Sequence, residues 1–158
     1  SSTSQNPQYI SSVYANSSTA SAYFDGVSKG SVTSVAGTSS YISLGYNGGT
    51  SYPSVQNVTL GTDAGVVTLN FDAYSVPDRF VVEFQGSVVI DTGYRGDSFY
   101  QNDLNNALIA LGEPTAPIVG LGSGSATFNK TAGTTTATVK VYAPMSGTGW
   151  TYTLGCPV

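Results

Sequence analysis

Three aspartates stand where apolar runs of the sequence begin or end, in a chain that otherwise carries little charge. They are Asp72, Asp78 and Asp91. If the runs 65–72, 79–84 and 87–91 form antiparallel neighbours, all three carboxylates come to the same edge of a sheet. Carboxylates gathered in this way repel one another unless a cation lies among them or one of them keeps its proton.

Two interpretations of these aspartates stay open. Oxygen ligands from loops, together with backbone carbonyls, suit Ca²⁺, so Asp72, Asp78 and Asp91 are candidate ligands of a structural calcium ion. Alternatively, Asp72 and Asp78 satisfy turn amides while Asp91 caps a turn. In that interpretation Asp78 also pairs with Arg79 or Arg95. The sequence holds no D-x-D-x-D-G loop, so the calcium prediction rests on the strand arrangement alone.

The sequence offers little that indicates catalysis. The chain contains no histidine, which removes the commonest general base and the commonest transition-metal ligand. Serine and threonine abound, yet no S-x-x-K motif is present to activate one of them. Glu83 and Glu113 leave a glycosidase-like pair of carboxylates open, but Glu83 is expected in the middle of a strand on a solvent face. We therefore expect that the protein is not an enzyme.

Composition restricts the possible partners. Charged residues make up 9% of the 158 residues, whereas soluble domains average about 25%. The net charge is −4 and only five residues are basic, so no patch is available to neutralise the phosphates of a nucleic acid. No apolar run approaches the roughly 20 residues of a membrane helix, so membrane insertion is not expected. A surface of hydroxyls, amides and glycine suits association with copies of itself or with neutral polymers.

The 11 tyrosines indicate a second kind of site. An exposed tyrosine ring has an apolar face and a polar tip, which suits stacking on sugars or packing in a protein interface. The segment 41–52 predicts such a surface, and its candidate ligand-binding residues are Tyr41, Tyr46, Asn47 and Tyr52. The alternative is that most tyrosines are strand residues that pack across a sheet.

The tripeptide Arg95-Gly96-Asp97 has the composition of an integrin-type adhesion motif. Matches of three residues arise often by chance. Asp97 also stands where the N-terminus of a following helix needs an acidic residue, so a structural role is the simpler interpretation.

Alternation of apolar and polar residues across 65–158 predicts half-buried β-strands. The apolar positions that share a face are Val67, Leu69, Phe71, Phe80, Val82, Phe84, Val88, Ile90, Ala126, Phe128, Ala137, Val139, Val141, Trp150, Tyr152 and Leu154. Shorter strands are expected near 9–14, 31–35, 40–46 and 55–60. These strands predict one all-β domain over 1–158, an antiparallel β-sandwich of jelly-roll type, in which residues 1–24 can form an extended N-terminal arm.

One segment departs from this pattern. Three leucines have helical spacing: Leu104, Leu108 and Leu111. Ser98 and Gln101 resemble a capping box, and Gly112 marks a stop. The spacing predicts one short helix at 100–111 that covers an open end of the sandwich, with its leucines in the core.

The stretch 30–60 resembles the phrasing of bacteriophage tail-fibre and receptor-binding proteins. It contains G-S-V-T-S-V-A-G-T at 30–38, G-G-T at 48–50 and V-T-L at 58–60.

Residues 65–157 resemble a recurrent β-sandwich module of bacterial secreted and surface proteins and of phage virion proteins. The motifs that carry this resemblance are D-x-Y-x-x-P-D at 72–78, D-T-G at 91–93, G-x-G at 122–124, G-T-x-W at 147–150 and C-P at 156–157. The resemblance implies an all-β extracellular or virion-surface domain used for attachment, without catalytic activity.

The expected function is a non-catalytic attachment or structural domain of a phage virion fibre, exposed on the virion surface. Its partner would be a host-surface glycan or protein, and the chain would form a homo-oligomer or assemble with other virion proteins. The alternative is a secreted bacterial surface protein, either a carbohydrate-binding module, an adhesin domain or a subunit of an extracellular filament. In a fibre, several weak sites add through their effective concentration.

Overall fold

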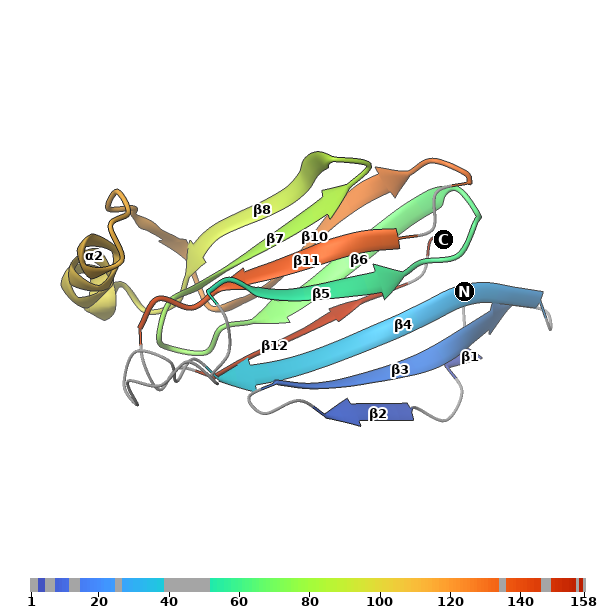
Figure 1. Ribbon diagram of the computed structural model, residues 1–158, viewed down its shortest axis with the longest axis horizontal. Helices are drawn as coiled ribbons and strands as arrows, with labels where there is room; N and C mark the ends of the chain where they lie inside the picture. The colour runs from blue at the N-terminus through green and yellow to red at the C-terminus, as the bar shows by residue number, and fades with distance from the viewer. Residues whose placement is uncertain are drawn as a thin grey trace.

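The computed structural model describes residues 52–133, 136–145, 149–155 and 157 in full, and the backbone of four strands before them. Within these ranges the chain is mostly β-structure with one α-helix (Figure 1). The all-β class predicted from the alternation is confirmed.

Two largely antiparallel sheets make up the fold. The larger sheet comprises β1 (Thr3–Ser4), β2 (Gln8–Ser11), β3 (Ala15–Phe24), β4 (Val27–Thr38), β6 (Gly65–Asp72), β10 (Ser123–Lys130) and β12 (Gly149–Leu154). Its order is β1-β3-β4-β12-β6-β10, with β2 also paired to β3. The smaller sheet comprises β5 (Ser54–Thr59), β7 (Asp78–Phe84), β8 (Ser87–Arg95), β9 (Ile118–Gly120) and β11 (Thr136–Tyr142). Its order is β5-β11-β7-β8-β9, and the pairing of β8 with β9 is parallel.

The first strands belong to the larger sheet of the same chain. β1 and β2 both pair with β3, which forms a hairpin with β4. The described part of 1–24 is therefore joined to its own chain. Of the short strands expected upstream, those near 9–14, 31–35 and 55–60 overlap β2, β4 and β5, and the one near 40–46 lies outside the described residues.

Consecutive strands β6 and β7 lie in different sheets. The predicted pairing of 65–72 with 79–84 is wrong, because β6 pairs with β10 and β12 while β7 pairs with β11 and β8. The connection 73–77 therefore crosses from one sheet to the other at the end of the sandwich.

The hairpin predicted between β7 and β8 is confirmed. Phe84 faces Ser87 across a two-residue turn. Gln85 and Gly86 both have positive φ angles, 53° and 78°. This is the mirror-image turn whose twist matches that of the strands on either side of it.

The core lies between the two sheets and holds the residues that alternation selects. Its larger side chains are Val58, Leu60, Val67, Leu69, Phe71, Phe80, Val82, Phe84, Ile90, Phe128, Val139, Val141, Trp150, Tyr152 and Leu154. Ala126 is partly buried and packs against them. Val88 is 57% exposed, so the prediction that it faces inward is wrong. A register shift between Val82 and Glu83 turns Val88 to the outside, as an extra residue in a strand does.

The predicted helix is confirmed as α2 (Gln101–Ala110), which lies at one end of the sandwich (Figure 1). Leu104 and Leu108 are buried in a second, smaller core with Tyr94. The capping box predicted from Ser98 and Gln101 is wrong. Asp97 instead caps the short 3-10 turn η1 (Ser98–Tyr100) that precedes the helix.

Gln101 has a different role from the capping that was predicted. Its side chain donates to the carbonyl of Ala116 at 2.9 Å and accepts from the N–H of Ile118 at 2.8 Å. These bonds fix the chain that returns from the helix to β9. The helix therefore positions the edge of the smaller sheet.

The buried hydroxyl of Tyr152 generates a stability prediction. Tyr152 is 2% exposed, stacks on Trp150, and its Oη has no hydrogen-bond partner among the described residues. Burial raises the pKa of this phenol, so it stays neutral. Removing an unsatisfied buried hydroxyl relieves its desolvation cost, so we expect Tyr152→Phe to raise the free energy of unfolding by about 1 kcal/mol in urea titrations.

The matched control is Tyr94→Phe. Tyr94 is also buried, but its hydroxyl lies 3.2 Å from that of Tyr52. This deletion should lower the free energy of unfolding by about 1 kcal/mol. A loss of stability in Tyr152→Phe would contradict the prediction.

Candidate binding site at the helical end of the sandwich

Asp72 ends β6 and Asp78 begins β7, whereas Asp91 lies in the middle of β8, so the prediction that all three stand at strand ends is wrong for Asp91. Asp72 Oδ1 accepts the backbone N–H of Tyr74 at 2.8 Å. Asp78 is fully buried as the first residue of β7, opposite Arg95 on β8. Asp91 is on β8, and its Oδ1 accepts the N–H of Gly93 at 3.0 Å. Asp72 and Asp91 therefore make the turn contacts of the second interpretation.

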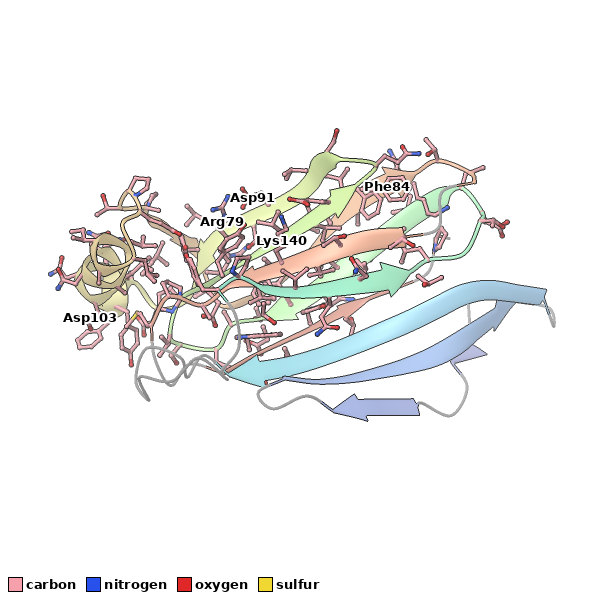
Figure 2. All side chains as sticks on the ribbon, in the orientation of Figure 1. Arg79, Phe84, Asp91, Asp103 and Lys140 are labelled. Carbon is pink, nitrogen blue, oxygen red and sulfur yellow. The ribbon has the colours of Figure 1, made fainter. Side chains whose placement is uncertain are left out.

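Asp91 also carries an ion pair. Arg79 Nε donates to Asp91 Oδ1 at 2.9 Å and Nη2 donates to Oδ2 at 2.6 Å (Figure 2 labels both residues). The hydrogen bonds from Arg79 hold the pKa of Asp91 below its usual value, and the N–H of Gly93 adds to this effect. The guanidinium lies 5.2 Å from the ring centroid of Tyr142. In the part of the chain that the structure describes, no three potential metal ligands come together.

The predicted tyrosine surface is described at one position. Tyr41, Tyr46 and Asn47 lie outside the described residues. The hydroxyl of Tyr52 donates to Glu113 Oε1 at 2.9 Å. Burial, and then the contacts with its neighbours, raise the pKa of Tyr52. This half-buried tyrosine therefore anchors the start of β5 to the helical end.

The four basic side chains that the structure describes all have partners. Beyond the ion pair of Arg79, Arg95 Nε donates to the carbonyl of Leu121 at 2.8 Å. Lys130 is 3% exposed and donates to two backbone carbonyls. Lys140 forms an ion pair with Glu83 at 3.0 Å. A polyanion finds no unengaged cation among these side chains.

The Arg95-Gly96-Asp97 tripeptide belongs to the scaffold. The guanidinium of Arg95 lies 4.9 Å from the ring centroid of Phe71. A Cβ on Gly96 would stand 2.8 Å from the carbonyl oxygen of Ser75, so the backbone there needs glycine. Asp97 Oδ1 accepts the N–H two residues later. These contacts favour the structural interpretation of the motif over adhesion.

A hollow of about 590 Å³ opens beside the 73–77 connection. Its lining residues are Tyr74, Ser75, Gly96, Asp97, Ser98, Ile118, Val119, Gly120, Leu121 and Gly122. We call it the Tyr74 hollow. Its size lies within the range of about 300–1,000 Å³ that is usual for small-molecule sites.

Backbone contacts hold the walls of the Tyr74 hollow in place. Three hydrogen bonds join its segments: Ala73 N to Gly122 O at 2.9 Å, Asp97 N to Ser75 O at 2.7 Å, and Gly96 N to Gly120 O at 2.9 Å. A Cβ on Gly122 would stand 2.1 Å from the carbonyl oxygen of Tyr74, so only glycine fits there. The walls are formed before any ligand arrives.

Tyr74 stands at the mouth of the hollow in an unusual backbone conformation. Its φ is +60°, a region that non-glycine residues seldom enter, and the residue is 55% exposed. The bond from Asp72 to its N–H stabilises this turn. Backbone strain of this kind costs about 1–3 kcal/mol and gathers at functional sites.

The lining of the hollow combines polar and apolar residues. Ser75, Asp97 and Ser98 are polar, and one carboxylate oxygen of Asp97 is engaged by the N–H of Phe99. Leu121, also in the lining, is 77% exposed. Sequence reasoning placed Asp72, Tyr74 and Gly122 in motifs but did not select Tyr74 as a binding residue. The available signal was the Asp72-x-Tyr74 spacing, in which an aspartate accepts the N–H two residues on.

A nucleophile motif present in the sequence does not take its usual structural context. Residues 26–30 read G-V-S-K-G and so match G-x-S-x-G, but Ser28 lies on β4. A hydrolase carries this serine on a strand-to-helix turn with a histidine partner. The G-x-S-x-G pattern at 26–30 therefore does not indicate a hydrolase.

The chain matches no protein-family model, and no curated protein or solved structure matches it. No helix among the described residues is long and apolar enough to cross a membrane. The function is therefore argued from the geometry of the chain itself.

The ion pair of Asp91 generates a prediction of pH dependence. Because the pKa of Asp91 is lower in the folded chain than in the unfolded one, the pair stabilises the fold above about pH 4 and this contribution is lost as the pH falls through the folded pKa. Both partners are more than a third exposed, so screening limits the effect. We expect Asp91→Asn to lower the free energy of unfolding by about 0.5 kcal/mol at pH 7.

The difference in unfolding free energy between Asp91→Asn and the natural chain should vanish at low pH, where Asp91 is protonated and therefore as neutral as asparagine. Urea titrations at a series of pH values measure it. The control is Asp91→Asn in the Arg79→Met background, where the ion pair is already absent and the substitution should change little at any pH. A difference that persists undiminished at low pH would contradict an ionic origin.

Proposed function

We propose that this chain is a non-catalytic attachment domain, exposed on a phage virion fibre, and that the Tyr74 hollow binds a neutral glycan of the host surface. The observation that carries the proposal is the exposed ring of Tyr74, held in a strained turn beside hydroxyls and a carboxylate. The ring of Tyr74 belongs to neither hydrophobic core and is 55% exposed, so it is available to a ligand.

The chemistry of the hollow favours a sugar. The face of a tyrosine ring packs against the apolar face of a pyranose, while the hydroxyls of Ser75 and Ser98 exchange hydrogen bonds with sugar hydroxyls. The carboxylate of Asp97 only accepts hydrogen bonds, and its charge repels an anionic ligand. The residues that line the hollow include no basic side chain, which favours a neutral glycan.

The virion assignment rests on the resemblance of 30–60 and 65–157 to phage proteins and on the weakly charged surface. We also propose that the two sheets have a jelly-roll topology. In a fibre, several copies add weak sites through their effective concentration. A secreted bacterial surface protein is the alternative, since the same hollow would serve a carbohydrate-binding module or an adhesin domain.

The oligomeric state separates these two locations. A stable trimer in solution favours the fibre, open polymers that grow with concentration favour an extracellular filament, and a monomer that binds polysaccharide favours a module. Analytical ultracentrifugation of the chain over a range of concentrations distinguishes them.

Structural calcium is a separate part of the proposal. Asp72 and Asp78 bracket the connection that carries Tyr74, so an ion held by their oxygens would stiffen the hollow. We expect the melting temperature to rise with Ca²⁺ and to fall with EDTA, because a ligand that binds only the folded state stabilises it. Mg²⁺ is the control, and an unchanged melting temperature in both would remove calcium from the proposal.

Tyr74→Gly tests the binding site and its strain together. Glycine adopts a φ of +60° without strain, so we expect the variant to be more stable by about 0.5–1 kcal/mol. It removes the ring, so we expect it to bind glycan at least tenfold more weakly. Chains displayed as streptavidin-linked tetramers on an array of neutral oligosaccharides provide the measurement.

The matched control is Val88→Ala. Val88 is as exposed as Tyr74, but it lies near the β7–β8 turn at the opposite end of the sandwich (Figure 1). It should bind as the natural chain does. If Tyr74→Gly binds glycan as strongly as the natural chain, the site lies elsewhere. If the natural chain binds no oligosaccharide on the array, the glycan is rejected as the ligand in favour of a protein partner.

A further inference from the structure

A second hollow of about 540 Å³ adjoins the first. It lies beside Arg79, Asp91, Ala116 and Pro117, and Val119 lines both hollows. β9 runs parallel to β8, with Tyr94 opposite Ile118 and Arg95 opposite Gly120. Both hollows therefore lie beside β9 and have Val119 as a common lining residue.

We infer that the two hollows form one groove for a linear oligosaccharide, with adjacent sugar residues on either side of Val119. This inference rests on the proposed function, because it assigns the length of the glycan that the Tyr74 hollow begins to bind. The oligosaccharide would contact the aromatic ring of Tyr74 at one end of the groove and the Arg79–Asp91 ion pair at the other.

The second hollow offers the polar groups that a sugar needs. Arg79 uses Nε and Nη2 on Asp91, and its Nη1 has no partner among the described residues. Both charges of the pair are about a third exposed. A guanidinium donor beside a carboxylate acceptor matches two neighbouring hydroxyls of one sugar residue, one accepting and one donating.

The pair is held in position before a ligand arrives. Tyr142 lies beneath the guanidinium of Arg79, which restricts its movement. Asp91 is fixed by the N–H of Gly93. Little side-chain freedom is therefore lost when a sugar binds, and preorganisation of this kind increases affinity.

The junction between the hollows depends on close packing. Gly93 has a φ of +66°, and a Cβ there would stand 2.8 Å from Val119 Cγ2. Val119 therefore lies against the backbone of β8, although it is 58% exposed. In the proposed groove, an oligosaccharide would pass over this exposed side chain.

The test is affinity as a function of chain length. The probes are neutral glucose and N-acetylglucosamine oligomers, from monosaccharides to hexasaccharides, and the same length series of any other neutral sugar that the array identifies. Isothermal titration with the full chain should show at least a tenfold gain in affinity from one sugar to two or three, followed by a plateau. An affinity that does not change with length overturns the inference and leaves the proposed function standing.

Arg79→Met separates the second hollow from the first. Methionine keeps apolar contact with Tyr142 but cannot bond a sugar, so the gain with length should disappear while monosaccharide affinity stays unchanged. Lys140→Met is the control, since Lys140 forms the other ion pair of the same sheet, outside both hollows. If the Arg79→Met variant keeps the full gain in affinity with oligosaccharide length, the inference is wrong.

Val119→Trp provides a second variant on an exposed side chain. A larger ring at the junction should block passage between the hollows and abolish the gain with length without unfolding the chain, which a melting curve verifies. A retained gain in this variant also overturns the inference. Absence of binding at every length by the natural chain overturns the proposed function itself.

Discussion

The crossing of the chain from β6 to β7 is the constraint on which the helical end of the molecule depends. These strands follow one another in sequence but lie in opposite sheets, so five residues must span the open end of the sandwich. The crossing is possible because Gly122 and Gly96 let two other segments approach its backbone closely. Asp72 accepts a hydrogen bond from the N–H of Tyr74 and so stabilises the turn. The position of Tyr74 follows from these contacts, since its φ is set by the crossing and not by its own preference.

Charge has a subordinate part in this architecture. The basic side chains that the structure describes are bound to carboxylates or to backbone carbonyls, and buried Lys130 closes the end of β10 in this way. Beside hydroxyls and amides, the surface of the described residues carries exposed apolar side chains such as Val88, Val119 and Leu121. Recognition by such a surface depends on shape and on directed hydrogen bonds, which salt screens weakly.

The local part of the fold could be predicted from the sequence. Alternation with a period of two identified the core positions, and leucine spacing identified α2, because each pattern depends on neighbours in the chain. The partner of β6 could not be predicted, since a short connection such as 73–77 serves a hairpin or a crossing between sheets equally well. The outward turn of Val88 depends on a register shift, which no hydrophobic pattern records. At the site, the importance of the 72–78 motif was evident, but the positive φ of Tyr74 arises from contacts with residues about 50 positions away.

The strained turn separates the scaffold of the site from the group that it presents. Gly122 contacts the carbonyl of residue 74 and Asp72 contacts its N–H, so both of these contacts are made with the main chain of that position. The side chain at 74 can therefore be exchanged without rebuilding the sandwich, provided that it tolerates a left-handed conformation, as asparagine, aspartate and glycine do. Under the proposed function, a substitution at position 74 would change what the hollow binds while the surrounding backbone contacts stay the same.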